Sequence, residues 1–223
     1  MIDYRRSPGQ RRNTGEIRVK GGIEAVVFDY GKVISLPPED SVARDIAALA
    51  GLPVKTMEDL ALRFRPDYDR GLVSASGYYE TLLRHGGVRV DAAVLERMGA
   101  MDIAGWSRIN GETVRLMERI KAGGTMLGIL SNMPWDFLAM ARENMPVFRL
   151  PDAGIFSCET GTVKPEEAIY RSLISALDCR PGEIIFFDDI RVNVDAALSL
   201  GINAFVWQDP LTAEEILKQH VVF

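Results

Sequence analysis

Residues 25–34 read AVVFDYGKVI, an apolar run that ends in the carboxylate of Asp29 and then turns at Gly31. A second such run, IIFFDD at 184–189, ends in two adjacent aspartates. Strands that are apolar throughout are typical of central, parallel strands buried on both faces. In open α/β sheets, ligands bind beyond the carboxyl ends of such strands. The two runs therefore predict an α/β sheet with acidic side chains at its functional edge.

From about residue 109 onward, helical and strand patterns alternate. One helical pattern ends near Gly123, and another, which begins after Lys164, carries Ile169 and Leu173. Strand patterns lie at 125–130, 154–157, 184–187 and 204–207. Such alternation predicts an α/β core built as a Rossmann-like, doubly wound parallel sheet.

Residues 37–108 differ from this alternation, because they contain several helical patterns and no strong strand pattern. We therefore expect a small helical cap domain inserted after the first strand, between core segments 22–36 and 109–223. Four residues are expected in a loop-like stretch that faces either the pocket or solvent: Arg63, Asp67, Tyr68 and Arg70.

Length, charge and cysteine content exclude several classes of protein. The 223 residues suit one main domain with a modest appendage, and the net charge of −5 gives no general attraction to nucleic acid. No apolar stretch approaches the roughly 20 residues that span a bilayer. The sequence has no apolar secretory region, which predicts a cytoplasmic protein in which Cys158 and Cys179 are reduced, buried thiols. We expect a monomer or a homodimer. The basic residues 1–21 predict a flexible tail.

Polar residues also follow the other predicted strand and helix boundaries. Ser131 and Asn132 follow the strand at 125–130, and Lys164 precedes a helix. The chain resembles the haloacid dehalogenase (HAD) superfamily, whose four motifs match, in order, FDYGKVI at 28–34, LSN at 130–132, KP at 164–165 and FDD at 187–189 with Asn193. Each motif alone is weak, but four in order form a strong joint signal.

The resemblance implies subfamily IA, with its small helical cap, and a Mg²⁺-dependent phosphatase. Such an enzyme acts on a small phosphorylated metabolite, for example a sugar phosphate, through an aspartyl-phosphate intermediate. The resemblance implies that Asp29 is the nucleophile and that Asp29, Asp189 and the backbone carbonyl of Gly31 are the metal ligands. It implies that Ser131, Asn132 and Lys164 bind the phosphate and that Ser131 and Lys164 also take part in catalysis. Asp188 and Asn193 are implied to support the site.

The residue types suit phosphoryl transfer on chemical grounds as well. A carboxylate can attack phosphorus, and Asp29 is expected to be ionised at neutral pH because the reference pKa of aspartate is about 3.9. Mg²⁺ prefers oxygen ligands and offsets the repulsion between a carboxylate and an anionic substrate. Lys164 supplies a compact positive charge.

Gly31 departs from the pattern of HAD phosphatases, which usually carry a second aspartate at this position as the general acid and base. Glycine keeps the backbone carbonyl for the metal and removes the proton donor. The bacterial α-glucose-1-phosphatase branch, which the chain resembles closely, shares this departure. A sugar 1-phosphate or an acyl phosphate leaves more readily than a simple alkoxide, so Gly31 predicts substrates of that kind.

Two alternative functions stay open. A metal-independent 2-haloacid dehalogenase also attacks through the aspartate, although it has little use for Asp189. A non-catalytic relative that binds a phosphorylated ligand or a protein is suggested by the missing acid at Gly31 and by the unusual Lys32.

Overall fold

The computed structural model describes residues 22–222, and its centre is a sheet of five parallel strands in the order β3-β2-β1-β4-β5. The strands are β1 (Ala25–Phe28), β2 (Met126–Ser131), β3 (Ala153–Phe156), β4 (Ile184–Asp188) and β5 (Asn203–Val206). In register, Phe28 of β1 lies opposite Ile129 of β2 and Phe187 of β4. The carboxyl ends of the three central strands therefore lie side by side at one edge of the sheet. The predicted α/β fold is confirmed.

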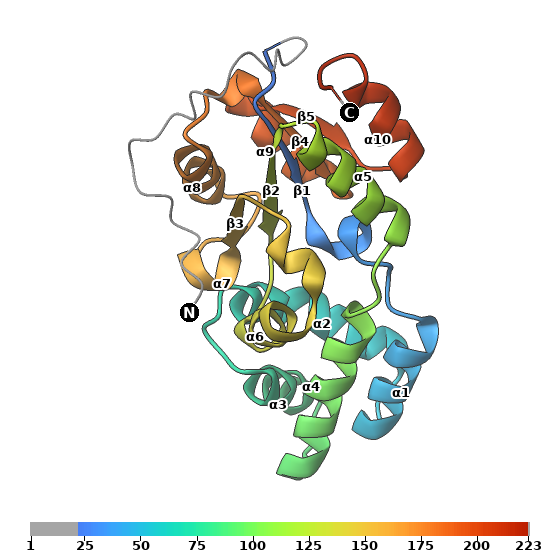
Figure 1. The fold of residues 1–223 in the computed structure, drawn as a ribbon. Helices are drawn as coiled ribbons and strands as arrows, with labels where there is room; N and C mark the ends of the chain where they lie inside the picture. The colour runs from blue at the N-terminus through green and yellow to red at the C-terminus, as the bar shows by residue number, and fades with distance from the viewer. Residues whose placement is uncertain (1–21, 223) are drawn as a thin grey trace.

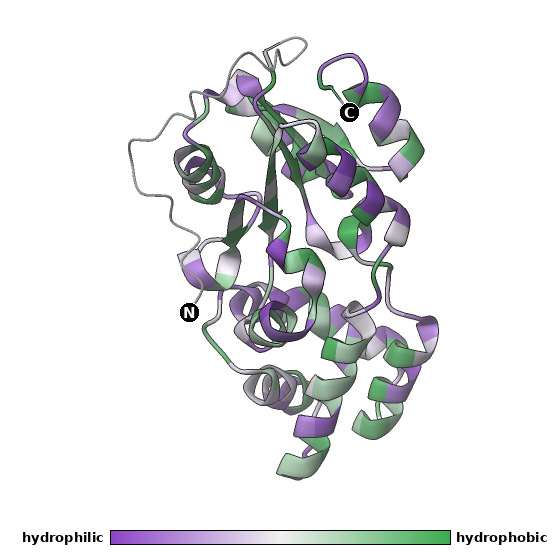
Figure 2. Ribbon diagram, in the orientation of Figure 1, coloured by the Kyte–Doolittle hydropathy of each residue, from purple (hydrophilic) through white to green (hydrophobic). Residues whose placement is uncertain are grey.

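Helices cover both faces of this sheet (Figure 1). One face packs against α5 (Gly111–Ala122), α6 (Trp135–Asn144) and α10 (Pro210–Leu217), and the other packs against α8 (Glu167–Leu177) and α9 (Arg191–Ser199). The short elements are the turns η1 (Tyr30–Ile34), η2 (Pro146–Arg149) and η3 (Pro181–Glu183) and the single-turn helix α7 (Ser157–Thr160). The strands are almost uniformly apolar, whereas the helices alternate apolar and polar faces (Figure 2). This pattern is expected for a sheet buried between two helical layers.

Four helices lie between η1 and α5: α1 (Asp40–Ala50), α2 (Val54–Asp69), α3 (Ala75–His85) and α4 (Ala92–Trp106). They enclose a hydrophobic cluster of their own, separate from the two clusters on the sheet. The chain leaves and re-enters the core side by side, because Ser35 and Ile109 form an antiparallel bridge and the N–H of Leu36 donates to the carbonyl of Arg108 at 2.7 Å. The division into core and cap at 37–108 stays a prediction.

The loop expected around Tyr68 is wrong, because α2 continues through this stretch to Asp69. Pro66 lies inside this helix, where proline is unfavourable by about 3 kcal/mol. Tyr68 is nevertheless fully buried and stacks on Tyr78 with ring centroids 4.7 Å apart, and this packing outweighs the local signal. Arg70 follows the helix and pairs with Glu166 of the core.

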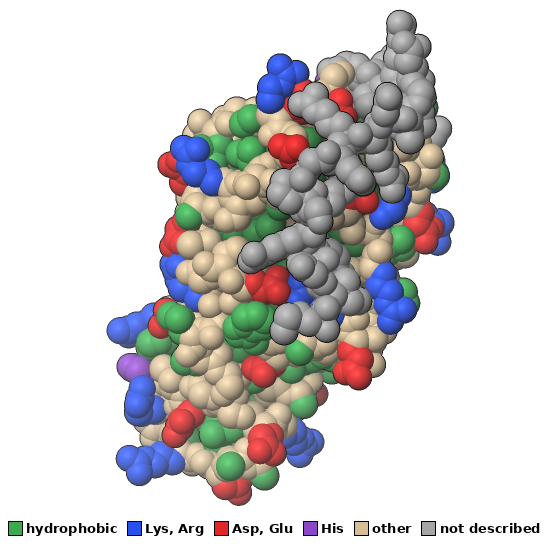
Figure 3. Space-filling model, turned by 60° about the vertical axis from the view of Figure 1, so that its left-hand side comes forward, with side chains coloured by type: hydrophobic (Ala, Val, Ile, Leu, Met, Phe, Trp, Pro, Cys, Tyr) green, Lys and Arg blue, Asp and Glu red, His purple; other side chains and the backbone are tan. Residues whose placement is uncertain are grey.

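The structure also bears on the expectations for the cysteines, for membrane spans and for surface charge. Cys158 and Cys179 are free thiols, the first buried and the second only half-buried. Within residues 22–222, no helix combines the length and the apolar character that crossing a membrane requires. Acidic and basic side chains are intermixed over the face drawn in Figure 3. The flexible tail predicted for residues 1–21 lies outside the described residues.

Candidate active site

Asp29 lies directly beyond β1, and the parallel register brings the end of β4 beside it. The N–H of Asp29 donates to the carbonyl of Phe187 at 2.9 Å, so Asp188 follows next to it. The carboxylate of Asp29 is buried and accepts a hydrogen bond from the N–H of Tyr30 at 2.7 Å. Two acids that are far apart in the sequence are therefore neighbours because their strands pair.

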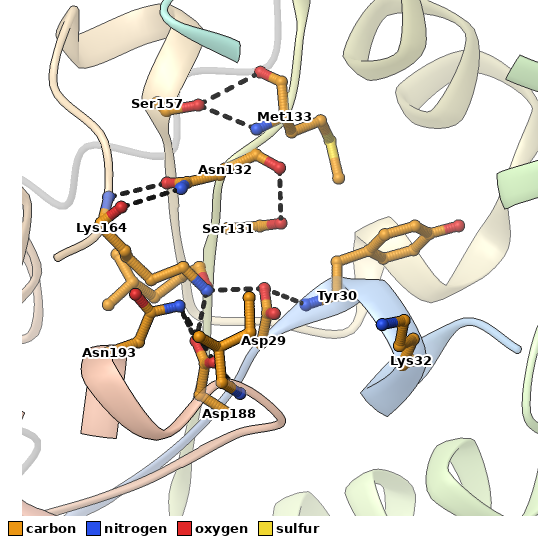
Figure 4. A network of polar contacts seen from close by, with 12 residues as sticks. Asp29, Tyr30, Lys32, Ser131, Asn132, Met133, Ser157, Lys164, Asp188 and Asn193 are labelled. Carbon is orange, nitrogen blue, oxygen red and sulfur yellow. Dashed lines mark hydrogen bonds and ion pairs between the residues drawn. The ribbon is translucent and has the colours of Figure 1, made fainter. Parts of the chain in front are cut away.

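Lys164 joins these two carboxylates (Figure 4). Its Nζ lies 2.8 Å from Oδ1 of Asp29 and 2.6 Å from Oδ2 of Asp188, and it also donates to the carbonyl of Leu130 at 3.0 Å. The side chain is only 1% exposed. An ammonium has three N–H donors. All three have a protein acceptor here, so Lys164 holds the carboxylates in place before any ligand binds.

Asn132 fixes the backbone of Lys164. Its Oδ1 accepts from the N–H of Lys164 at 2.8 Å, and its Nδ2 donates to the carbonyl of Lys164 at 3.1 Å. This two-point contact ties the end of β2 to the loop before α8. The side chain of Asn132 thus positions Lys164, and the phosphate contact predicted from the sequence would use the backbone N–H of Asn132.

Asn193 and Asp188 form the inner side of the site. The Nδ2 of Asn193 donates to both oxygens of Asp188, at 3.0 and 3.1 Å, and the N–H of Ile190 donates to Oδ1 at 2.8 Å. Asn193 is held in turn by Tyr170, whose hydroxyl donates to its carbonyl at 2.9 Å. Asn193 therefore contacts Asp188, which in turn contacts Lys164, and the supporting roles of Asp188 and Asn193 stay predictions.

Burial dominates the electrostatics of Asp29. Desolvation, together with Asp188, outweighs the attraction of Lys164 and raises the pKa of Asp29 to about 7. The expectation of a fully ionised carboxylate at neutral pH is therefore wrong for the metal-free site. Desolvation alone would lower the pKa of Lys164, but Asp29 and Asp188 overcome it and raise that pKa above its ordinary value. Lys164 therefore stays charged, and a bound cation would favour the ionised form of Asp29.

Asp189 stands at the outer side of the same cluster. Oxygens of Asp29, Asp188 and Asp189 all lie within 4.8 Å of one another. Hard oxygen donors at this spacing suit Mg²⁺. Asp188 already has both oxygens engaged by Lys164, Asn193 and a backbone N–H, which favours the other two aspartates as ligands. Burial raises the pKa of Asp189, and the ammonium of Lys32, 3.5 Å from its Oδ2, opposes this rise.

Trp106 at the end of α4 is a site residue that sequence reasoning missed. A Cβ added to Gly31 would lie 3.5 Å from Cζ3 of its indole ring. The hydroxyl of Tyr30 donates to the carbonyl of Trp106 at 2.8 Å, which holds α4 against the turn after β1. An apolar ring thus covers the position where the acidic side chain of related phosphatases would begin. No signal in the sequence linked residue 106 to Gly31, because 75 residues separate them.

Ser131 ends β2, whose Ile129 lies opposite Phe28 of β1. Its side chain is buried, and among residues 22–222 its Oγ makes a single long hydrogen bond, 3.4 Å, to the carbonyl of Asn132. The structure therefore brings all the predicted site residues to one edge of the sheet. Their catalytic and ligand roles stay predictions.

The fold and the site define a class of α/β proteins with a carboxylate cluster at the carboxyl edge of a parallel sheet. Residues 23–201 match the family model described as haloacid dehalogenase-like hydrolase, and the chain belongs to this family.

Two curated relatives differ in how much of their length is aligned. Phosphatase MT3486 of Mycobacterium tuberculosis (strain CDC 1551 / Oshkosh) is 24% identical over 196 residues, which cover 82% of this chain and 87% of that protein. Acyl-CoA dehydrogenase family member 10 of Mus musculus is 32% identical over 104 residues, which cover 46% of this chain and only 9% of that protein. The second match therefore concerns one small part of a much longer protein.

Solved structures share the fold at low sequence identity. A predicted HAD-like family hydrolase from Porphyromonas gingivalis has a TM-score of 0.70 and 22% identity, covering 90% of this chain and 100% of that chain. HAD family enzyme BT-2542 from Bacteroides thetaiotaomicron, in complex with magnesium and inorganic phosphate, has a TM-score of 0.67 and 17% identity, covering 83% and 94%. These likenesses support the architecture of core and helices.

Proposed function

We propose that the protein is a Mg²⁺-dependent phosphatase that hydrolyses a small phosphorylated metabolite through an aspartyl-phosphate on Asp29. The observation that carries the proposal is the position of Asp29, held by Lys164 on one side and adjoining Asp189 on the other. A nucleophile, a cation and a metal ligand meet at one strand end, as phosphoryl transfer requires.

In the proposed reaction, a carboxylate oxygen of Asp29 attacks phosphorus, and the bond from phosphorus to the leaving oxygen breaks, so that this oxygen departs with the electron pair as an anion and takes a proton from solvent. Water then attacks the phosphorus of the aspartyl-phosphate and gives up a proton to solvent, which breaks the bond to Asp29, releases inorganic phosphate and regenerates the carboxylate. The hydroxyl of Ser131 and the backbone N–H of Asn132 would donate to phosphoryl oxygens. Lys164 holds Asp29 in place and balances the charge that develops.

Mg²⁺ bound to oxygens of Asp29, Asp189 and the carbonyl of Gly31 would neutralise charge on the phosphoryl group. The donor set described above supports this cation. The relatives support it as well, since BT-2542 was crystallised with magnesium and inorganic phosphate and MT3486 is named a phosphatase.

The surroundings of Gly31 narrow the proposed substrate. Position 31 has no side chain to protonate a leaving group, and Trp106 brings an apolar ring there instead. A sugar 1-phosphate or an acyl phosphate needs the least help to leave, so we assign the protein to substrates of this type, as in the α-glucose-1-phosphatase branch of subfamily IA. Helices α1–α4 would then form the cap that contacts the leaving group.

The test is a panel of phosphate esters, assayed for phosphate release with Mg²⁺ and with chelator. We expect turnover only with Mg²⁺, fastest on sugar 1-phosphates and acyl phosphates. Asp29→Asn should lower turnover at least ~10³-fold, because it removes the nucleophile. The variant should remain folded, since burial already favours a neutral group at this position.

Two outcomes would overturn the proposal. Halide release from 2-haloacids in the presence of chelator, without phosphate release, would identify a dehalogenase. A wild-type protein that binds phosphorylated ligands but turns none over would identify a binding protein.

A further inference from the structure

Lys32 has a backbone conformation that favours glycine. Its φ is 59° and its ψ is 3°, and within residues 22–222 only Lys32 and Asp178 combine a side chain with positive φ. The left-handed region is unfavourable for a long side chain, and such outliers cluster at functional sites. A lysine at this strained position suggests that its side chain has a functional role.

The side chain of Lys32 lies at the open side of the site. Its Nζ is 3.5 Å from Oδ2 of Asp189, and the side chain is 55% exposed, compared with 20% for Asp189. Figure 4 shows Lys32 on the opposite side of Asp29 from Asn193. The site thus has an inner cation, Lys164, and an outer cation, Lys32.

The inner cation has no N–H left for a ligand, because Asp29, Asp188 and the carbonyl of Leu130 accept all three. The outer cation is different. It has an ion pair with Asp189 alone among the described residues, at a distance longer than a direct hydrogen bond. Its ammonium is therefore the one that can change partner when a ligand enters.

The charges at the site change sign when a divalent cation enters. With Asp29 ionised, as a metal ligand must be, three carboxylates and two ammonium groups carry one net negative charge, so a bound divalent cation leaves one net positive charge. Without Lys32 the same cation would leave the site neutral. Lys32 therefore repels the metal when it enters alone and attracts an anion once the metal is bound.

We propose that Lys32 couples the binding of Mg²⁺ to that of the substrate phosphate: its ammonium pairs with Asp189 in the empty site and transfers to a phosphoryl oxygen when metal and phosphate are both bound. This inference rests on the proposed function, because it assumes that Asp189 is a metal ligand. It deepens that function by making Mg²⁺ binding weak until a phosphorylated ligand is present.

Isothermal titration calorimetry of the full chain tests the coupling with two probes, Mg²⁺ alone and inorganic phosphate at saturating Mg²⁺. Lys32→Met removes the charge and keeps most of the side-chain volume. We expect Lys32→Met to bind Mg²⁺ alone about tenfold more tightly than wild type, and phosphate about tenfold more weakly, because one screened charge is removed.

Three further variants serve as controls. Lys32→Arg should bind both probes nearly as wild type does, because the charge is kept. Lys32→Gly relieves the left-handed backbone and should match Lys32→Met in binding, which separates the charge from the backbone. Lys55→Met removes a charge from an exposed pair with Asp59 on α2 and should change neither affinity.

The results separate this inference from the proposed function. If wild type binds Mg²⁺ and phosphate and Lys32→Met binds both equally well, the coupling is wrong and the phosphatase proposal stands. If Lys32→Gly binds as wild type does while Lys32→Met does not, side-chain shape is responsible and the coupling is again wrong. If wild type binds neither probe, both proposals fail.

Discussion

Two clusters among the described residues each join two carboxylates through one cation, and the first is buried whereas the second is only partly buried. In the core, Lys164 joins Asp29 and Asp188 at the ends of β1 and β4. Among the inserted helices, Arg65 joins Asp69, at 2.8 Å, and Asp102 of α4, at 3.2 Å. The two clusters have the same charges, but their surroundings differ.

The helical cluster is closed by packing. Arg65 lies over the ring of Tyr68 at 5.3 Å, and its pair with Asp102 ties α2 to α4. The core cluster instead adjoins Asp189, a partly exposed acid at the outer edge of the sheet. A cluster of one cation and two carboxylates is therefore insufficient to indicate a site. What distinguishes the core cluster is its place at the strand ends, where further ligand oxygens are available.

The largest expected effect comes from Lys164→Met. This change leaves two buried carboxylates without their cation and should lower the free energy of unfolding by about 3–5 kcal/mol, measured by urea denaturation. Lys55→Met, in an exposed pair, should leave that free energy unchanged. Equal stabilities of the two variants would show that the core cluster is not a buried ion network.

A second prediction concerns Gly31, where the two regions meet at Trp106. Gly31→Asp adds a proton donor and should raise kcat on simple alkyl phosphates about 100-fold, within the usual range for general acid–base help. Gly31→Asn, which has the same shape but no acidic proton, should not. Equal rates for the two variants would mean that the Trp106 ring keeps the new carboxyl away from the leaving group.

Arg65→Met tests whether the helical cluster is only structural. It removes the cation between Asp69 and Asp102 and should cost about 2 kcal/mol of unfolding free energy. Because this cluster lies outside the proposed metal site, titration calorimetry should give an unchanged affinity for Mg²⁺. A large loss of Mg²⁺ binding would show that the two clusters act together.

The smallest expected effect is a dependence on pH that belongs to the core cluster alone. Burial raises the pKa of Asp29 to about 7, so the carboxylate forms as pH rises through 7 and is protonated below it. Because protons compete with the metal, the apparent affinity for Mg²⁺ should fall about tenfold from pH 8 to pH 6. Arg65→Met should have the same profile. An affinity that is flat over this range would contradict either the raised pKa of Asp29 or its role as a metal ligand.

Much of the core site was accessible from the sequence. Asp29 and Asp189 follow apolar runs, and such runs predict parallel strands whose carboxyl ends meet. The helical insert was predicted as helical but not in its details, because the stretch that holds Arg63, Asp67 and Tyr68 was expected to be a loop and is part of α2. Long-range packing of Tyr68 against Tyr78 decides that stretch, and local propensity does not report such packing.

The sequence by itself determined the class of fold, because strand periodicity suffices for it, and the resemblance of its four ordered motifs to the HAD superfamily implied which acids and cations gather at one edge of the sheet. Only the tertiary structure decided how each group is used. It gave Lys164 three protein acceptors, covered Gly31 with Trp106 and set Lys32 against Asp189. These contacts join residues far apart in the chain, and the raised pKa of Asp29 arises from burial, which exists only in the folded protein.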